Sequence, residues 1–462
     1  MAETTTTLRG LPFVGCLFSF RRDPLRFLRE TAARSGRAWI PLGRNRVLLV
    51  TAPEDVDHVL RHAHESYRKR EELLVRVMGE SILTAEGKVW VERRRIVQKE
   101  LGPDSMPHVA GTSATEVQKL IDDWRRLAGA PTDLQRDMRR LTLNIIVRAM
   151  FSASMSDPEL EEARGAIDVV MEYVQARWLG LVDVPLQAPT PLNSRFKEAI
   201  ATLDRLVYQM IRGRRAGGYR DGSPDNPDLL DQLLKATHKP TDPGESAKRF
   251  DPRESAKRFE DQEIRNEVMT IFLAGHETTA MTLSWAFDLL GRHPGVARQV
   301  HEEAVAVLGG RVATLDDLSR LPAASRVVHE TLRLYPPAWL LSRVAKVEDH
   351  LAGEVVPAGT TVWLSPYLTH RRRDVWGADA DEYKPERWKG HPKLPDGAFI
   401  PFGIGPRKCA GDLFALTELT LIVASVCQHF RVDPLNATPV PPRPLITLRP
   451  GARIDARPVP WT

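Results

Sequence analysis

One cysteine near the C-terminus lies in a setting that would favour an ionised, metal-binding thiol. Residues 402–411 read FGIGPRKCAG, so Cys409 follows Arg407 and Lys408 in a glycine-rich loop and precedes a helix-forming run at 410–430. Both cations and the positive end of a helix stabilise a thiolate. A free cysteine is more often a small core side chain, so this loop alone does not separate a metal ligand from an inert cysteine.

The sequence around Cys409 narrows the kind of metal centre. No second cysteine or histidine lies at the short spacing that zinc or iron–sulfur sites use. A haem iron needs one protein ligand and leaves the opposite position for O2, and a thiolate ligand favours cleavage of the O–O bond. The loop therefore fits a haem ligand if the rest of the chain supports one.

A proton-relay pair is predicted on the longest helical pattern, residues 260–290. Its centre, 274–279, reads AGHETT. The mid-helix glycine costs about 1 kcal/mol relative to alanine, and the Thr278 hydroxyl can bond the carbonyl four residues back, so we expect a local opening. Glu277 and Thr278 could then pass protons as an acid–alcohol pair. The alternative is a kinked core helix with His276 and Glu277 facing solvent.

A charged network is predicted downstream. Glu330 and Arg333 are three residues apart, which places both side chains on one helix face. Arg387 could complete a buried triad that clamps the segment 371–400, and with it the cysteine loop, onto the core. The alternative is a surface ion pair worth less than about 1 kcal/mol.

Several basic side chains could hold an anionic cofactor group. Trp90 and Arg94 are one turn apart on a helix expected at 88–101, so the arginine could bind a carboxylate that the tryptophan covers. Further candidates for this role are Arg343, His370 and Arg407. The alternative is a solvated basic helix.

Composition excludes several classes of protein. The chain has 462 residues, 42% of them hydrophobic, and 3 cysteines, which argues against a disulfide framework and for a reducing, cytoplasmic setting. The N-terminus lacks a signal-peptide pattern, and the apolar stretch 11–20 is far short of the ~20 residues that a membrane anchor needs. The net charge is +5, and the basic residues are spread along the whole chain, so nucleic-acid binding is not expected. Basic clusters at 93–95, 371–373 and 407–408 form either one face for an acidic protein partner or scattered solvated charges.

Hydrophobic periodicity predicts one mainly α domain, residues 1–462, with a small β-rich part. Further helices are expected at 24–35, 53–63, 113–127, 134–151, 157–179, 194–215, 228–236, 294–308, 314–318 and 323–334. Strands are expected in a hairpin at 38–51, near 355, at 361–364 and at 445–448. Residues 1–22 and 371–400 are expected to be irregular, and the proline-rich stretch 180–191 to form a lid. A duplication, ESAKRF at 245–250 and 254–259, receives no functional interpretation.

The order and separation of these motifs resemble the cytochrome P-450 superfamily, the haem-thiolate monooxygenases. The matching motifs are Phe402-x-x-Gly405-x-Arg407-x-Cys409-x-Gly411, Ala274-Gly275-x-Glu277-Thr278, Glu330-x-x-Arg333 with Arg387, and Trp90-x-x-x-Arg94. The resemblance implies a haem b (iron protoporphyrin IX) with Cys409 as its ligand, Phe402 and Gly411 in the haem-binding loop, and proton delivery by Glu277 and Thr278. The propionates would be held by Trp90, Arg94, Arg343, His370 and Arg407.

The resemblance further implies insertion of one oxygen atom from O2 into a hydrophobic small molecule such as a terpenoid, polyketide or fatty acid. Electrons would come from NAD(P)H through a separate ferredoxin or flavodoxin with its reductase, because too few residues follow Cys409 for a fused reductase. Candidate substrate-pocket residues are Arg76, Trp178, Leu181, Ile271, Phe272, Ala274, Ala338 and Trp339. The alternatives are a peroxide-using or isomerising haem-thiolate enzyme, which would not need the acid–alcohol pair, and a haem-binding sensor or electron carrier, which would not need an apolar lid.

Overall fold

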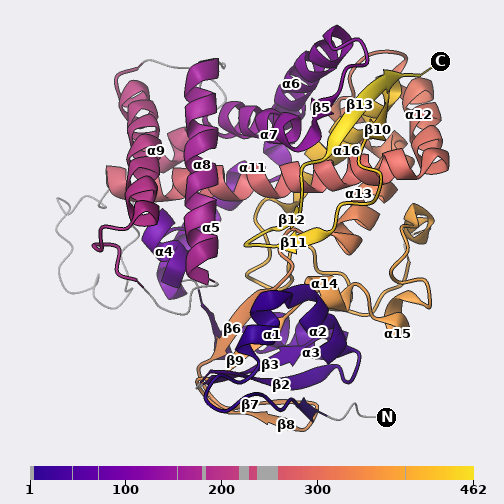
Figure 1. Ribbon diagram of the computed structural model, residues 1–462. Coiled ribbons are helices and arrows are strands. Elements are labelled where there is room, and N and C mark those ends of the chain that lie inside the picture. Colours follow the sequence, from indigo (N-terminus) through magenta and orange to yellow (C-terminus); the bar gives the residue numbers. More distant parts are fainter. Residues whose placement is uncertain are drawn as a thin grey trace. The chain divides into compact units, whose positions relative to one another are not determined.

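A computed structural model describes most of the chain as two compact units. The described residues are 5–43, 45–70, 72–152, 155–178, 184–217, 228–236, 259–390 and 392–461. Unit 1 comprises residues 1–70, 117–138 and 278–462, and unit 2 comprises residues 71–116 and 139–277. Three helices contribute residues to both units: α6 (Met106–Arg126), α7 (Leu134–Phe151) and α11 (Asp261–Arg292). The predicted fold class is confirmed, because helices dominate and strands form a minor part (Figure 1).

Unit 1 holds a six-stranded mixed sheet. In spatial order its strands are β1 (Thr6–Thr7), β2 (Arg37–Leu42), β3 (Asn45–Val50), β9 (Thr361–Leu364), β6 (Leu341–Ala345) and β4 (Tyr67–Lys69). Strands β2 and β3 form the expected antiparallel hairpin, and β3 pairs in parallel with β9. Val47 and Leu49 pack into one core cluster, whereas Leu48 and Val50 pack into another. This alternation shows that both faces of the sheet are covered, as the continuous apolar run predicts.

Three small sheets complete the β-rich part of unit 1. They are β10 (Phe430–Pro434) with β13 (Asp455–Pro460) and β5 (Thr132–Asp133), β11 (Pro442–Pro444) with β12 (Leu448–Pro450), and β7 (Asp349–Leu351) with β8 (Glu354–Val356). The strand expected at 445–448 is wrong in its bounds. Residues 445–447 form the turn between β11 and β12, where the Leu445 amide donates to the Thr447 carbonyl.

The helices that lie wholly in unit 1 mostly begin at a proline, whose fixed φ suits the first helical turn. They are α1 (Leu17–Arg22), α2 (Pro24–Ala32), α3 (Pro53–Asp57), α12 (Pro294–Leu308), α13 (Pro322–Leu334), α14 (Pro366–Thr369), α15 (Arg373–Trp376) and α16 (Asp412–His429). A π-helical turn at His58–His62 extends α3, and 3-10 helices cover Leu315–Arg320 and Pro385–Trp388. Helix α16 is buried on nearly every side and packs against α12 and α13, which makes it a core helix.

Unit 2 is helical. Its own helices are α4 (Glu72–Met78), α5 (Gly87–Glu100), α8 (Asp157–Trp178), α9 (Pro191–Arg215) and α10 (Leu229–Lys235). Helices α8 and α9 lie side by side (Figure 1), and the rings of Tyr173 and Phe196 stack between them at 3.8 Å. Arg214 of α9 holds α10 through Asp228, at 2.9 Å, and Asp231, at 2.8 Å.

Several boundaries differ from those expected. Residues 1–22 are not wholly irregular, since they contain β1 and α1. Helix α6 begins at Met106 rather than 113, because burial of Val109 and Ala110 outweighs the helix penalty of a nearby glycine. Residues 180–183 of the expected lid, and the duplication except for Phe259, lie outside the described residues. Within the described ranges, no helix has the length and apolarity needed to cross a bilayer.

Candidate active site

The cysteine loop of unit 1 is built by close backbone packing. Gly405 adopts φ +72°, and a Cβ atom there would lie 2.1 Å from the carbonyl oxygen of Leu60, so only glycine fits. The Cys409 amide donates to the Phe402 carbonyl at 2.9 Å, which closes the loop. The Cys409 side chain is exposed, and α16 begins three residues later with Gly411 as its N-cap. The thiol is therefore accessible at the positive end of a core helix.

The cations of this loop have distinct surroundings. Lys408 is exposed and pairs with Asp412 in the first turn of α16. Arg407 is half-buried, as is Arg343 in β6, whose guanidinium donates to the Ser342 carbonyl at 2.9 Å. These three cations all belong to unit 1, and each retains some accessible surface. Nothing in this geometry conflicts with an anionic group bound by Arg343 or Arg407.

His370 does not have the role that the sequence predicts for it. It is fully buried, and its Nε2 accepts the Ile400 amide at 2.8 Å. Nδ1 lies 3.1 Å from the Arg333 carbonyl oxygen, so Nδ1 must carry the hydrogen and donate. Burial lowers the pKa of His370 to about 3, which keeps the ring neutral. Both ring nitrogens are thus used inside the protein, and His370 has no nitrogen left for a propionate.

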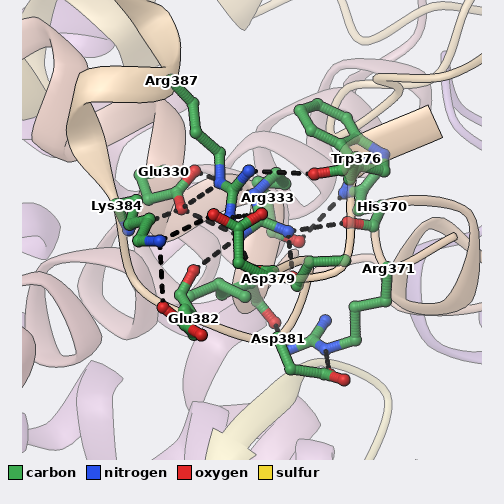
Figure 2. Close-up of polar contacts among 12 residues, drawn as sticks. Glu330, Arg333, His370, Arg371, Trp376, Asp379, Asp381, Glu382, Lys384 and Arg387 are labelled. Carbon is green, nitrogen blue, oxygen red and sulfur yellow. Dashed lines mark hydrogen bonds and ion pairs between the residues drawn. The ribbon is translucent and has the colours of Figure 1, made fainter. Parts of the chain in front are cut away.

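Glu330 and Arg333 of α13 form a buried ion pair in unit 1 (Figure 2). Two parallel hydrogen bonds of 2.8 Å join the Arg333 guanidinium to the Glu330 carboxylate. Its other N–H groups donate to the carbonyls of His370, Ala380 and Glu382. All five N–H groups are therefore used, and the surface ion pair considered as the alternative is excluded.

Arg387 completes this network from the 3-10 helix Pro385–Trp388. Its Nε lies 3.4 Å from Glu330 Oε1, and it pairs with Asp379 at 2.7 Å. Lys384 and Arg387 together hold the pKa of Asp379 down to about 2. Glu330 also accepts hydrogen bonds from the Lys384 amide and the Trp388 indole. The segment 370–388 is thereby fixed onto α13, as Figure 2 shows.

The centre of α11 carries an accessible stretch inside a buried helix. Residues 264–290 are buried except that Ala274 is exposed and Gly275 and Thr278 are partly exposed. Helix α11 is therefore covered on almost every side along this length. The helix also continues without interruption through 274–278, so the expected local opening is not observed. A Cβ at Gly275 would lie 2.8 Å from Ile146 Cδ1, which explains a small residue here.

Glu277 and His276 face the interior of unit 2 rather than solvent. Glu277 is 0% exposed, and Arg139 of α7 places its Nε 3.8 Å from Glu277 Oε2. Arg139 also reaches the partly exposed Asp168 of α8 at 3.5 Å. His276 Nδ1 lies 2.8 Å from the Phe272 carbonyl oxygen, and burial lowers the pKa of its ring. These contacts exclude the predicted alternative of a solvent-facing pair.

Helix α5 presents its basic residues in different directions. Trp90 and Arg94 are both half-buried and one turn apart, as the spacing predicts. Arg93 is instead buried at 2% exposure and pairs with Glu263 at 2.8 Å. The cluster 93–95 therefore cannot act as one positive surface. The interior acid beside Arg93 is Glu267, which the sequence does not distinguish from the other polar residues of EDQEIRNE at 260–267.

The predicted substrate-pocket residues fall into three groups. Phe272 and Trp339 are buried in the interior. The Phe272 ring contacts Phe151, and the Trp339 indole donates to the Leu445 carbonyl. Neither side chain can therefore line a pocket. Ile271 is also buried, whereas Ala338 is half-buried and Ala274 and Arg76 are exposed. The side chain of Trp178 and the whole of Leu181 lie outside the described residues.

The donor set of the loop fits a haem. Among the residues that the structure describes, no three His, Cys, Asp or Glu side chains gather as a metal site. A single accessible thiol therefore suits a metal that brings its other ligands with it, as the iron of a porphyrin does. Partly exposed arginines suit its carboxylates.

Comparisons with known proteins give the family. A model of the Cytochrome P450 family matches residues 6–453. Cyclooctat-9-en-7-ol 5-monooxygenase of Streptomyces melanosporofaciens is 34% identical, covering 94% of this chain and 91% of that protein. Cyclooctatin synthase of the same organism is 33% identical, covering 96% and 93%, and pentalenene oxygenase of Streptomyces avermitilis is 29% identical, covering 97% and 95%. The chain therefore belongs to the cytochrome P450 family and is a haem-dependent monooxygenase that acts on a hydrophobic substrate with electrons from a redox partner.

Proposed function

We propose that this monooxygenase hydroxylates or epoxidises a terpenoid. The observation that carries the proposal is its similarity, along nearly the whole chain, to two Streptomyces oxygenases named for cyclooctatin compounds and to one named for pentalenene. The accessible stretch of α11 supports it, because Ala274 and Gly275 are small and apolar and leave room for a bulky hydrocarbon. Polyketides and fatty acids have no comparable support.

Cys409 is the proposed ligand of the haem iron, and the bound haem would supply the activation of O2 and the transfer of one oxygen atom. Its exposed thiol and its position before α16 support this role. Trp90 and Arg94 of unit 2 and Arg343 and Arg407 of unit 1 are the proposed partners of the haem propionates. Each is partly exposed, which a ligand-binding side chain requires.

Glu277 and Thr278 are the proposed proton-handling pair. Glu277 places a carboxyl inside the protein, and Arg139 Nε lies 3.8 Å from one of its oxygens. Asp168 continues this chain of charged groups to partly exposed surface. Thr278, which is partly exposed on the next position of α11, offers the hydroxyl that passes the proton on.

The electron donor is proposed to be a ferredoxin or flavodoxin with its NAD(P)H-dependent reductase. Lys408 is exposed next to the proposed ligand, and a cationic surface there suits an acidic partner. The low count of 3 cysteines in 462 residues supports a reducing, cytoplasmic setting. We also propose that residues 1–462 act as a single catalytic domain, since the family match spans residues of both units.

A spin-state titration tests the substrate class. The haem-loaded protein would be titrated with matched panels of cyclic terpenes and terpene alcohols, fatty acids and macrolides of similar size. The proposal expects saturable low-spin to high-spin shifts with terpenoids, followed by mono-oxygenated products when redox partners and NAD(P)H are supplied. Shifts and products with fatty acids or macrolides alone would contradict it.

A further inference from the structure

Arg265, Asn266, Glu267 and Thr270 of α11 tie down the end of α4 and the loop that follows it, all within unit 2. The Arg265 guanidinium donates to the Val77 carbonyl at 3.3 Å, and the side-chain Nδ2 of Asn266 donates to the Glu80 carbonyl at 3.4 Å. The Ile82 amide donates to both carboxylate oxygens of Glu267 at 3.1 Å. The hydroxyls of Thr270 and Ser81 lie 2.7 Å apart. The end of α4 and the loop that follows it are therefore held mainly through backbone groups, and the Ser81 hydroxyl adds a side-chain contact.

The loop is shaped to fit this attachment. Gly79 adopts φ +70°, and a Cβ there would lie 2.4 Å from the Asn266 side chain. Thr84 closes the loop on itself, since its hydroxyl donates to the Gly79 carbonyl at 2.7 Å and accepts the Ser81 amide at 2.9 Å. Residues 79–84 therefore form one compact loop, and its contacts to Asn266, Glu267 and Thr270 set its position.

The loop 79–84 borders the accessible stretch of α11. Thr270 and Ala274 are four residues apart, so they lie one above the other on the same helix face, about 6 Å along the axis. The next residue on that face is Thr278. The clamp at Thr270 is thus one helical turn from Ala274, the most accessible residue of the stretch.

We propose that Glu267 is a positioning residue, which with Asn266 and Thr270 clamps residues 79–84 beside the substrate-facing part of α11 in a proton-dependent way. The substrate-facing role rests on the proposed function, whereas the clamp itself does not. Movement of residues 79–84 would change the space beside Ala274, so the clamp would control which terpenoid skeletons are accepted and how tightly they bind.

The surroundings of Glu267 make the clamp sensitive to protons. The carboxyl is 0% exposed, and burial is the main cause that raises its pKa to about 7. The Ile82 amide and Arg93 of α5, whose Nε is 3.6 Å away, favour the charged form, while Glu263 on α11 and Glu80 in the loop oppose it. Opening would return the carboxyl to water and to its ordinary pKa of 4.5. The closed form therefore binds the proton more tightly, and opening becomes easier as the pH rises.

Amide hydrogen exchange of the haem-loaded, substrate-free protein measures this opening. Protection at Ile82, corrected for the intrinsic pH dependence of exchange, should fall about tenfold between pH 6 and pH 8, the change that a shift from 4.5 to about 7 gives. Glu267→Gln should remove this pH dependence. The matched control Glu198→Gln, at an exposed position of α9, should behave like the parent. Hydrogen exchange of the α16 amides serves as the control for any change in global stability.

Thr270→Val provides a second, independent variant. It removes the hydroxyl contact to Ser81 but keeps Glu267, so protection of residues 79–84 should fall at both pH values while the tenfold ratio persists. The proposal is overturned if the parent shows no corrected pH dependence at Ile82, or if Glu267→Gln keeps it. Because exchange is measured without substrate, this result is separate from the spin-state test of the terpenoid proposal.

Discussion

Replacing Arg333 by lysine separates hydrogen-bond geometry from charge in the buried network of Figure 2. Two of the five hydrogen bonds of Arg333 go to Glu330, and three go to backbone carbonyls between residues 370 and 382. A lysine has three donors on one nitrogen, so a lysine that keeps both hydrogen bonds to Glu330 has one donor for three carbonyls and leaves two of them without a partner. At about 1–3 kcal/mol for each such group, the free energy of unfolding should fall by ~2–6 kcal/mol.

Urea denaturation followed by haem absorbance and by far-UV circular dichroism measures this loss. Arg326→Lys is the matched control on the same helix; Arg326 is only half-buried, so its replacement should change the free energy of unfolding by less than ~0.5 kcal/mol. A loss below about 1 kcal/mol for Arg333→Lys, or a loss equal to that of the control, would show that charge alone holds the segment. The account of the network would then be wrong.

Two further predictions concern His370 and Thr278. Because burial lowers the pKa of His370 to about 3, its contribution to stability is complete above pH 6.5 and is lost as the pH falls from 6.5 towards 3, by up to ~1.4 kcal/mol per pH unit. His370→Gln, which stays neutral, should flatten that part of a stability–pH curve; an unchanged slope would mean that other groups cause it. Thr278→Ala should keep NAD(P)H consumption but give less product and more hydrogen peroxide, measured against the control Thr282→Ala one turn further along α11. Full coupling in Thr278→Ala would exclude Thr278 from proton delivery.

Local patterns were enough to predict most elements of the fold. Helix α7 begins and ends at the expected residues, and the ends of α11 and α13 lie at most two residues from those expected, because prolines and apolar periodicity mark them directly. The hairpin of β2 and β3 followed from its continuous apolar strands. The short strands β4 and β5 could not be found, since two or three residues paired with distant segments leave no periodic signal.

The site was only partly predictable for a different reason. The pairing of Glu330 with Arg333 depends on helical spacing, which a sequence displays. The roles of His370 and Trp339 depend on burial among segments distant in the chain, and a basic or aromatic side chain looks the same in sequence whether it is exposed or enclosed. Glu267 was missed because nothing in the sequence shows that the Ile82 amide, far away in the chain, needs an acceptor.

The most direct test of the whole account is the absorption spectrum of the reduced, CO-bound protein with and without Cys409. The parent should show the long-wavelength Soret band typical of thiolate-ligated haem. Cys409→Ala should lose that band, whereas the control Cys427→Ala, at a buried position of α16, should keep it. A Cys409→Ala protein that retains the parent band would contradict the assignment of the ligand.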